Sequence, residues 1–243
     1  MKLLKSKIDS SLLKVTFYEL IDFENDYTKF NNFEKKVISK KMPDIVEIKI
    51  DTSEVEKIKF FEDQGFRFSE FKIFRILNLH EKSWSYTSKY PYNCIKVNST
   101  DKLKEIIKIA NFIQFDDRFS NNIQIPKSIS HERNIKFLKK SYLKADESII
   151  CITNQNTKEI VCYQSFKRLN KNGILLFLDG TIPKYDYMKE TFFFIYQNWF
   201  IEQEYFFIKS FSSGENIKDI NSSLKVQGYN IDSTYVILEK KYK

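Results

Sequence analysis

The sequence contains little cysteine, glycine, proline or histidine, and each shortage excludes a class of protein. Its 243 residues include five Gly, four Pro, three Cys and two His. So few glycines and prolines, with 42% hydrophobic residues, are typical of an ordered globular chain and exclude fibrous or disordered proteins. Cys94, Cys151 and Cys162 show no metal-ligand spacing, so we expect buried, reduced thiols rather than a metal or redox site.

Long hydrophobic runs are also missing. The longest apolar stretch, 191–200, is half of the roughly 20 residues that a membrane span requires, and it includes Gln197 and Asn198. Residues 1–8 carry Lys2, Lys5 and Lys7 and lack the continuous apolar segment of a secretory signal. We therefore expect a soluble, cytoplasmic protein that does not associate with membranes.

The net charge of +8 is compatible with an anionic partner. The lysines are scattered over the surfaces of predicted helices instead of forming one run with interleaved aromatic residues. This distribution favours a solvated surface, and nucleic acid is not expected as a partner.

The first third of the chain shows a strand, helix, strand, helix, strand pattern. A strand is predicted over 13–20, a helical stretch over 27–41 and an alternating strand over 45–50. Ser53 and Glu56 form a capping box for the next helix, which Gly65 ends, and a long strand follows over 66–79.

Part of this pattern returns near the end of the chain. A strand over 205–209 leads to a helix with Ile217, Ile220 and Leu224 on one face, which Gly228 ends. The two breaks read Gln-Gly-Phe at 64–66 and Gln-Gly-Tyr at 227–229, so we predict an internal structural repeat.

The middle of the chain follows a polar, turn-rich segment at 84–93. We predict this segment to be a linker between a domain at 1–83 and a second domain at 94–243. Within the second domain the patterns predict strands over 95–97, 148–153, 160–167 and 173–178. Thr100 is predicted to cap a helix, and two further helices are predicted to start at 131 and at about 187.

This order of elements, with the ending Glu215-Asn216-Ile217 and Gly228-Tyr229, resembles the GNAT superfamily of N-acyltransferases. The first domain resembles the truncated half-unit that precedes a full unit in the dTDP-fucosamine N-acetyltransferase type of GNAT protein. The resemblance implies a mixed α/β fold of two tandem GNAT-like units, the first truncated, each with a mixed, mostly antiparallel sheet flanked by helices.

A segment at 115–119 carries the resemblance into the acceptor pocket. Phe115-Asp116-Asp117-Arg118-Phe119 is similar to a segment that lines this pocket in the sugar-modifying members. The resemblance implies that an acetyl or short hydroxyacyl group passes from acyl-CoA to the amine of a dTDP-linked amino-deoxyhexose, as in surface polysaccharide (lipopolysaccharide O-antigen) biosynthesis. Phe115, Arg118 and Phe119 would bind the sugar nucleotide, and Arg118 could clamp its diphosphate.

The chemistry requires a base for the amine and a fixed N–H donor for the thioester carbonyl. Asp179, at the end of a predicted strand, is our first candidate for the base, and Asp116 and Asp117 are alternatives. Each also fits a structural role, Asp179 as a turn residue and the other two as helix-end residues or ion-pair partners of Arg118. Acyl-CoA would be a cosubstrate, no permanently bound cofactor is expected, and a homodimer is left open. The residues expected to contact coenzyme A are Leu178, Gly180, Thr181, Tyr187, Met188, Lys189, Asn216 and Asn221.

Two positions depart from the superfamily pattern. The glycine-rich turn that holds the coenzyme A diphosphate is replaced by residues 186–191, which contain no glycine. Leu224 stands where a tyrosine commonly protonates the leaving thiolate, so Ser222 or Ser223 would have to substitute unless no acid is needed. Two alternative functions stay open: a GNAT-derived binding module without activity, and an aminoacyl-tRNA-dependent transferase.

Overall fold

The computed structural model describes residues 1–23, 26–79, 91–113 and 126–242. Two compact units account for the chain: unit 1 comprises Met1–Ile73, Ser213–Glu215 and Ser233–Lys243, and unit 2 comprises Phe74–Ser212 and Asn216–Asp232. Strands β4 (Arg67–Asn78) and β10 (Asn230–Lys241) contribute residues to both units. The predicted linker at 84–93 lies largely outside the described residues, so the limits at 83 and 94 remain a prediction.

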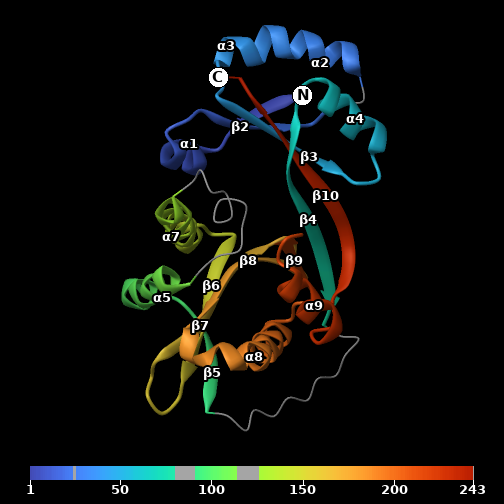
Figure 1. The fold of residues 1–243 in the computed structure, drawn as a ribbon. Helices are drawn as coiled ribbons and strands as arrows, with labels where there is room; N and C mark the ends of the chain where they lie inside the picture. Colours follow the sequence, from blue (N-terminus) through green and yellow to red (C-terminus); the bar gives the residue numbers. More distant parts are fainter. Residues whose placement is uncertain (24–25, 80–90, 114–125, 243) are drawn as a thin grey trace. The chain divides into compact units, whose positions relative to one another are not determined.

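Unit 1 is a sheet in the order β1-β2-β3-β10-β4, with helices on its outside (Figure 1). β2 and β3 are parallel, whereas β1 and β2, and β3 and β10, are antiparallel. Its remaining strands are β1 (Lys2–Lys5), β2 (Phe17–Ile21) and β3 (Ile45–Asp51). Its helices are α1 (Lys7–Leu13), α2 (Tyr27–Phe33), the π-helical η1 (Glu34–Ile38), α3 (Ser39–Lys41) and α4 (Val55–Asp63).

Phenylalanine rings fill the core of unit 1. Phe61 on α4 is fully buried, and its ring centroid lies 5.1 Å from those of Phe30 and Phe66 and 4.8 Å from that of Phe23. The rings meet edge to face or at a tilt, the arrangements that the aromatic quadrupole favours.

Unit 2 is a mostly antiparallel sheet in the order β4-β9-β8-β7-β6-β5, in which β8 and β9 are parallel. Its other strands are β5 (Tyr92–Lys96), β6 (Glu147–Asn154), β7 (Ile160–Arg168), β8 (Gly173–Thr181) and β9 (Phe207–Ser213). Its helices are α5 (Thr100–Phe112), α7 (Lys127–Leu143), the 3₁₀-helical η2 (Pro183–Met188), α8 (Lys189–Glu202) and α9 (Ile217–Lys225).

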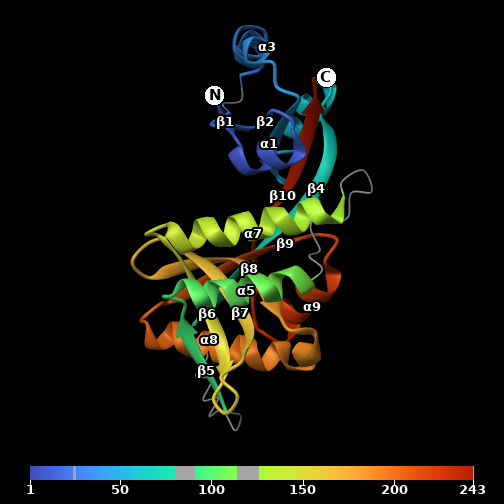
Figure 2. The ribbon, with the colours of Figure 1, turned by 90° about the vertical axis from the view of Figure 1, so that its left-hand side faces the viewer.

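Helices cover both faces of the unit 2 sheet (Figure 2). α5 and α7 pack on one face, where Ile106 and Leu138 are fully buried against Ile149 and Tyr163. α8 packs on the other face through an apolar stripe that includes Phe192, Ile195, Tyr196 and Phe200. The predicted mixed α/β fold with a mixed, mostly antiparallel sheet is therefore confirmed, and no helix of the described chain is both long and apolar enough to cross a membrane.

Several local predictions were wrong at element ends. Ser53 makes no capping box, because its N–H and hydroxyl donate to Asp51 Oδ1 at 2.9 and 2.7 Å and the helix begins at Val55. Ser99, rather than Thr100, caps α5 by accepting from the N–H of Lys102. The strand predicted over 13–20 begins only at Phe17, because Lys7–Leu13 form a helix, and α7 begins at Lys127 rather than at 131.

The predicted repeat has the same element order in both copies. β3-α4-β4 and β9-α9-β10 each consist of a strand, a helix and a strand. Gly65 and Gly228 follow the helices with positive φ values of 87° and 76°, a conformation that a residue with a Cβ rarely adopts. Gly65 lies two residues after the end of α4 and Gly228 three residues after the end of α9, so each glycine allows the chain to turn away shortly after its helix.

Candidate active site

The parallel strands β8 and β9 of unit 2 pair only over their first residues. Gly173–Leu175 of β8 pair with Phe207–Lys209 of β9, but β8 continues to Thr181 and β9 to Ser213. In the described part of the chain, no strand pairs with β8 on this side beyond Leu175. Among the residues that the structure describes, the carboxyl half of β8 therefore has no strand beside this edge, which we call the unpaired edge of β8.

On its other side β8 pairs with β7, and a β-bulge interrupts the pairing at Ser165. The register shifts between Gln164 and Phe166 of β7. At the shift, Leu178 donates its N–H to Ser165 Oγ at 2.9 Å, and Ser165 Oγ donates to the Leu178 carbonyl at 3.1 Å. Ser165 is 1% exposed, so its side chain replaces the main-chain partner that the bulge removes.

The pairing with β7 also determines where the last N–H groups of β8 point. Ile182 donates its N–H to the Val161 carbonyl at 2.9 Å, and in an antiparallel ladder hydrogen-bonded pairs alternate with pairs that make no such bond. Gly180, opposite Tyr163, is therefore a hydrogen-bonded position. The N–H groups of Asp179 and Thr181 point away from β7, toward the unpaired edge.

Gly180 is required at this point by close packing. A Cβ there would lie 2.6 Å from Tyr163 Cε1 and would also overlap Ile113. Ile113 is the residue directly after α5, and Tyr163 is fully buried in the core beneath α5 and α7. This glycine lets the end of β8 approach the helices that cover it.

Asp179 lies beside the unpaired edge in an unusual electrostatic environment. The surrounding protein desolvates its carboxylate and, with the negative charge of Asp219, raises the pKa of Asp179 from 3.8 to about 6, while Lys189 and Arg75 oppose the rise. The side chain nevertheless remains accessible to solvent. A carboxylate with a pKa near 6 can exchange a proton at neutral pH.

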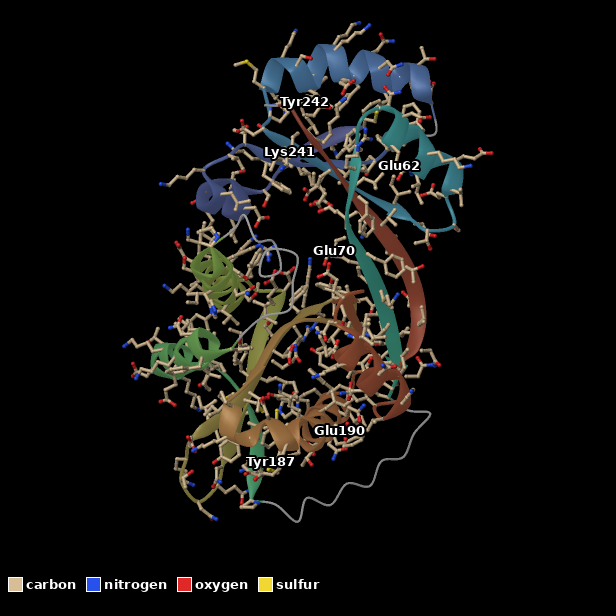
Figure 3. The ribbon with its side chains drawn as sticks, viewed as in Figure 1. Glu62, Glu70, Tyr187, Glu190, Lys241 and Tyr242 are labelled. Carbon is tan, nitrogen blue, oxygen red and sulfur yellow. The ribbon has the colours of Figure 1, made fainter. Side chains whose placement is uncertain are left out.

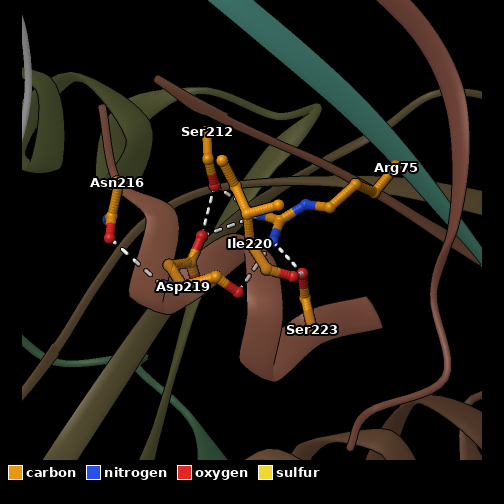
Figure 4. A network of polar contacts seen from close by, with 6 residues as sticks. All are labelled: Arg75, Ser212, Asn216, Asp219, Ile220 and Ser223. Carbon is orange, nitrogen blue, oxygen red and sulfur yellow. Dashed lines mark hydrogen bonds and ion pairs between the residues drawn. The ribbon is translucent and has the colours of Figure 1, made fainter. Parts of the chain in front are cut away.

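A buried arginine connects the end of β9 to α9 (Figure 4). Arg75 of β4 is 4% exposed, and its Nη2 lies 2.6 Å from Ser212 Oγ and 3.0 Å from Asp219 Oδ2. Its Nη1 donates to the Asp219 carbonyl at 3.3 Å and to Ser223 Oγ. Ser212 in turn donates to the Asp219 carboxylate. We refer to Arg75, Ser212, Asp219 and Ser223 as the Arg75 network.

The Arg75 network accounts for two residues at the start and end of α9. Asn216, which we predicted to contact coenzyme A, caps α9 by accepting from the Asp219 N–H at 3.2 Å. Ser223 is 1% exposed, accepts from Arg75 and donates to the Ile220 carbonyl at 2.8 Å. Its hydroxyl is thus already engaged, which argues against a role as the proton donor.

The other residues considered at the carboxyl end of α9 lie as follows. Ser222 Oγ donates to Glu190 Oε1 at 3.4 Å. Leu224 packs against the core beneath α8. Asn221, predicted to contact coenzyme A, is exposed on α9.

The predicted site residues fall into three groups in the structure. Leu178, Asp179, Gly180 and Thr181 lie together at the end of β8. At the turn into α8, Met188 is 6% exposed within the core and Lys189 is bound to Asp186 at 3.2 Å. Tyr187, which Figure 3 labels, is 82% exposed. The third group lies outside the described residues: Phe115, Asp116, Asp117, Arg118 and Phe119.

Sequence reasoning missed Arg75, Asp219 and Ser165. One signal was present, because Arg75 occupies an inward position of β4 between Ile73 and Leu77. A charge in the apolar register of a strand predicts a buried partner. The identity of that partner, 144 residues away in the sequence, could not be read from the pattern.

Comparison with known proteins gives a fold but no sequence relative. No protein-family model and no curated protein matches the sequence. A GCN5-related N-acetyltransferase from Sphaerobacter thermophilus superposes with a TM-score of 0.66 at 10% identity, covering 99% of this chain and 75% of the other. A tandem GNAT protein from the clavulanic acid biosynthesis pathway gives 0.60 at 9% identity, covering 93% and 75%.

A third structure is also similar over most of the chain. The GCN5-related N-acetyltransferase from Kribbella flavida has a TM-score of 0.58 at 9% identity, and the match covers 93% of this chain and 81% of the other. These identities are too low to carry an activity from one protein to another. The chain therefore has the fold of the GCN5-related N-acetyltransferases, as the order of its elements predicted.

Proposed function

We propose that the chain is an N-acyltransferase that moves an acyl group from a pantetheine thioester to an amine, with acyl-CoA as the donor that the resemblance implies. The observation that carries this proposal is that β8 and β9 stop pairing after Leu175 and Lys209. An extended, amide-containing chain such as pantetheine can pair with an unpaired strand edge through main-chain hydrogen bonds. The edge ends at Asp179 and Thr181, whose N–H groups point toward it.

The end of β8 supplies the two chemical functions that direct acyl transfer needs. The N–H of Asp179 or Thr181 would donate to the thioester oxygen and stabilise the negative charge that develops in the tetrahedral intermediate. The Asp179 carboxylate would accept a proton from the attacking amine, for which a pKa of about 6 is suitable.

The reaction balances without another reactant. A nitrogen–carbon bond forms, the carbon–sulfur bond breaks, and the proton removed from the amine equals the proton that the departing thiolate takes up. A thiol with a pKa of about 8.5 leaves readily, so the reaction does not require Ser222 or Ser223 as an acid.

For the acceptor, we propose the amine of a nucleotide-linked amino-deoxyhexose. The support is the likeness of Phe115-Asp116-Asp117-Arg118-Phe119 to the acceptor segment of sugar-modifying GNAT proteins. Asp116 and Asp117 remain alternative bases, and Phe115, Arg118 and Phe119 remain proposed acceptor ligands. A half-unit followed by a full unit is the arrangement that this proposal assumes.

The test is release of free thiol by the full-length protein, given acetyl-CoA and a panel of amines that includes a dTDP-linked amino sugar. Asp179→Asn should lower kcat/KM by about 100-fold or more at neutral pH, because a base of this kind contributes at least that factor. The rate of the unmodified protein should fall as the pH drops through about 6, where Asp179 becomes protonated.

Asp101→Asn provides the matched control. Asp101 is an exposed carboxylate on α5, and its loss should change neither the rate nor its pH dependence. Equal rates for Asp179→Asn and the unmodified protein would remove Asp179 from the mechanism. Absence of turnover with every amine and donor would instead favour the non-catalytic binding module.

A further inference from the structure

The turn that precedes α8 uses up its own main-chain donors. Residues Pro183–Met188 form a 3₁₀-helix that leads directly into α8. Tyr185 donates its N–H to the Ile182 carbonyl at 2.8 Å, and Lys189 donates its N–H to the Asp186 carbonyl. Pro183 has no N–H to offer. Successive 3₁₀ hydrogen bonds leave the turn with few N–H groups directed at an anion.

The charges around this turn also disfavour a polyanion. Asp186 and Glu190 already occupy the positive end of α8, where Figure 3 shows Glu190. Lys189, the cation nearest to them in sequence, is paired with Asp186, and Lys184 is paired with Glu159 at 2.9 Å.

Carboxylates and paired cations also lie around the end of β8. The acids at the start of α8 and around Asp179 are Asp179, Asp186, Glu190 and Asp219. The cations that act on Asp179 are Lys189 and Arg75, and both are bound to carboxylates. In the described part of the chain Asp179 and Glu190 form no ion pair, so these two carboxylates are left unneutralised beside cations that are already paired.

The unpaired edge of β8, by contrast, can bind an uncharged ligand, because its main-chain groups are neutral. It offers main-chain N–H and carbonyl groups that suit the two amides of a pantetheine arm. The two halves of coenzyme A therefore meet different surfaces here: the arm meets a complementary strand edge, and the nucleotide diphosphate meets a closed turn flanked by carboxylates.

We infer that the donor is recognised through its acyl-pantetheine arm and that the nucleotide of coenzyme A adds no affinity. This inference rests on the proposed function and names its donor class: a pantetheine thioester without a nucleotide, either free or attached through a single phosphate to a carrier protein. One phosphate brings less negative charge to the acidic turn than the three of coenzyme A.

Isothermal titration of the full-length protein with pantetheine, with coenzyme A and with the nucleotide half of coenzyme A alone tests the inference. Pantetheine and coenzyme A should have dissociation constants within about tenfold of each other, and the nucleotide half should not bind. Binding of coenzyme A more than about 100-fold tighter than pantetheine would overturn the inference while supporting the proposed function. Failure of both pantetheine ligands to bind would overturn both.

A pair of variants on one helix tests the role of charge. Glu190→Gln removes a carboxylate at the start of α8, and Glu202→Gln removes one at its end. Glu190→Gln should strengthen coenzyme A binding at low salt and leave pantetheine binding unchanged, because only the nucleotide carries charge to the turn. Glu202→Gln should alter neither affinity, and equal effects of the two variants on coenzyme A would contradict the argument.

A final experiment distinguishes free pantetheine from carrier-bound pantetheine as the donor. A carrier protein is titrated with and without its phosphopantetheine group. Tighter binding of the modified carrier than of free pantetheine assigns the donor to a carrier, and equal affinities assign recognition to the arm alone. Acyl transfer should then proceed from acyl-pantetheine with a kcat/KM within about tenfold of that from acyl-CoA.

Discussion

Removing the two partners of the buried Arg75–Asp219 ion pair should have unequal effects on stability. Arg75 is 4% exposed, whereas the side chain of Asp219 is 43% exposed. Asp219→Ala leaves a guanidinium inside unit 2 without its counterion. Removing one partner of a buried pair costs about 3–5 kcal/mol of unfolding free energy.

The structure places this cost at the lower end of the range. In Asp219→Ala the guanidinium keeps three neutral acceptors: Ser212 Oγ, Ser223 Oγ and the carbonyl of residue 219. We therefore expect a loss of about 3 kcal/mol. Arg75→Met removes the buried charge itself and leaves a carboxylate that water reaches, so it should cost about 1–2 kcal/mol, mainly in lost hydrogen bonds.

The double variant separates this explanation from simple loss of contacts. If the unpaired guanidinium causes the damage, Arg75→Met in the Asp219→Ala background should recover about 1–2 kcal/mol. Urea unfolding followed by Trp199 fluorescence measures this in unit 2, with Trp84→Phe as the background so that one tryptophan reports. Asp101→Ala, which removes an exposed partner of Lys104, is the control and should have no measurable effect.

The reasoning would be refuted if Arg75→Met destabilised the protein more than Asp219→Ala. It would also be refuted if the double variant were less stable than Asp219→Ala, because the arginine would then stabilise the fold even without its counterion.

Two further predictions concern β8. Because the folded pKa of Asp179, about 6, lies above its ordinary value of 3.8, the fold favours the protonated form, and this stabilisation is present below about 3.8 and lost as the pH rises through 6. Asp179→Asn should therefore raise the melting temperature above pH 6 but not below 3.8, and an equal shift at both pH values would contradict this sign. Ser165→Ala should lower the free energy of unfolding by about 1–3 kcal/mol, because the N–H and carbonyl of Leu178 lose a buried partner. Ser222→Ala is its control in urea unfolding, since Ser222 bonds at the surface, and equal losses would show that the bulge does not need its serine.

The repeating element order was predictable because it depends on local periodicity. Alternation in β3 and β4 and the glycines at 65 and 228 act over a few residues. The residues that cap helices were less predictable. Ser53 donates to Asp51 instead of capping α4, and Ser99 caps α5 although the neighbouring Thr100 is an equally suitable residue type.

The sequence by itself determined the element order and the position of Asp179 and Gly180 at the end of a strand, and its resemblance to GNAT proteins implied the mixed sheet flanked by helices. The element order follows from side-chain periodicity and from the conformational limits of glycine. Tertiary structure alone decided where β8 leaves β9, which residue completes the bulge, and that Arg75 meets Asp219. Each of these depends on strand pairing or on contacts between residues far apart in the sequence, and local patterns carry no information about which distant partner satisfies a buried group.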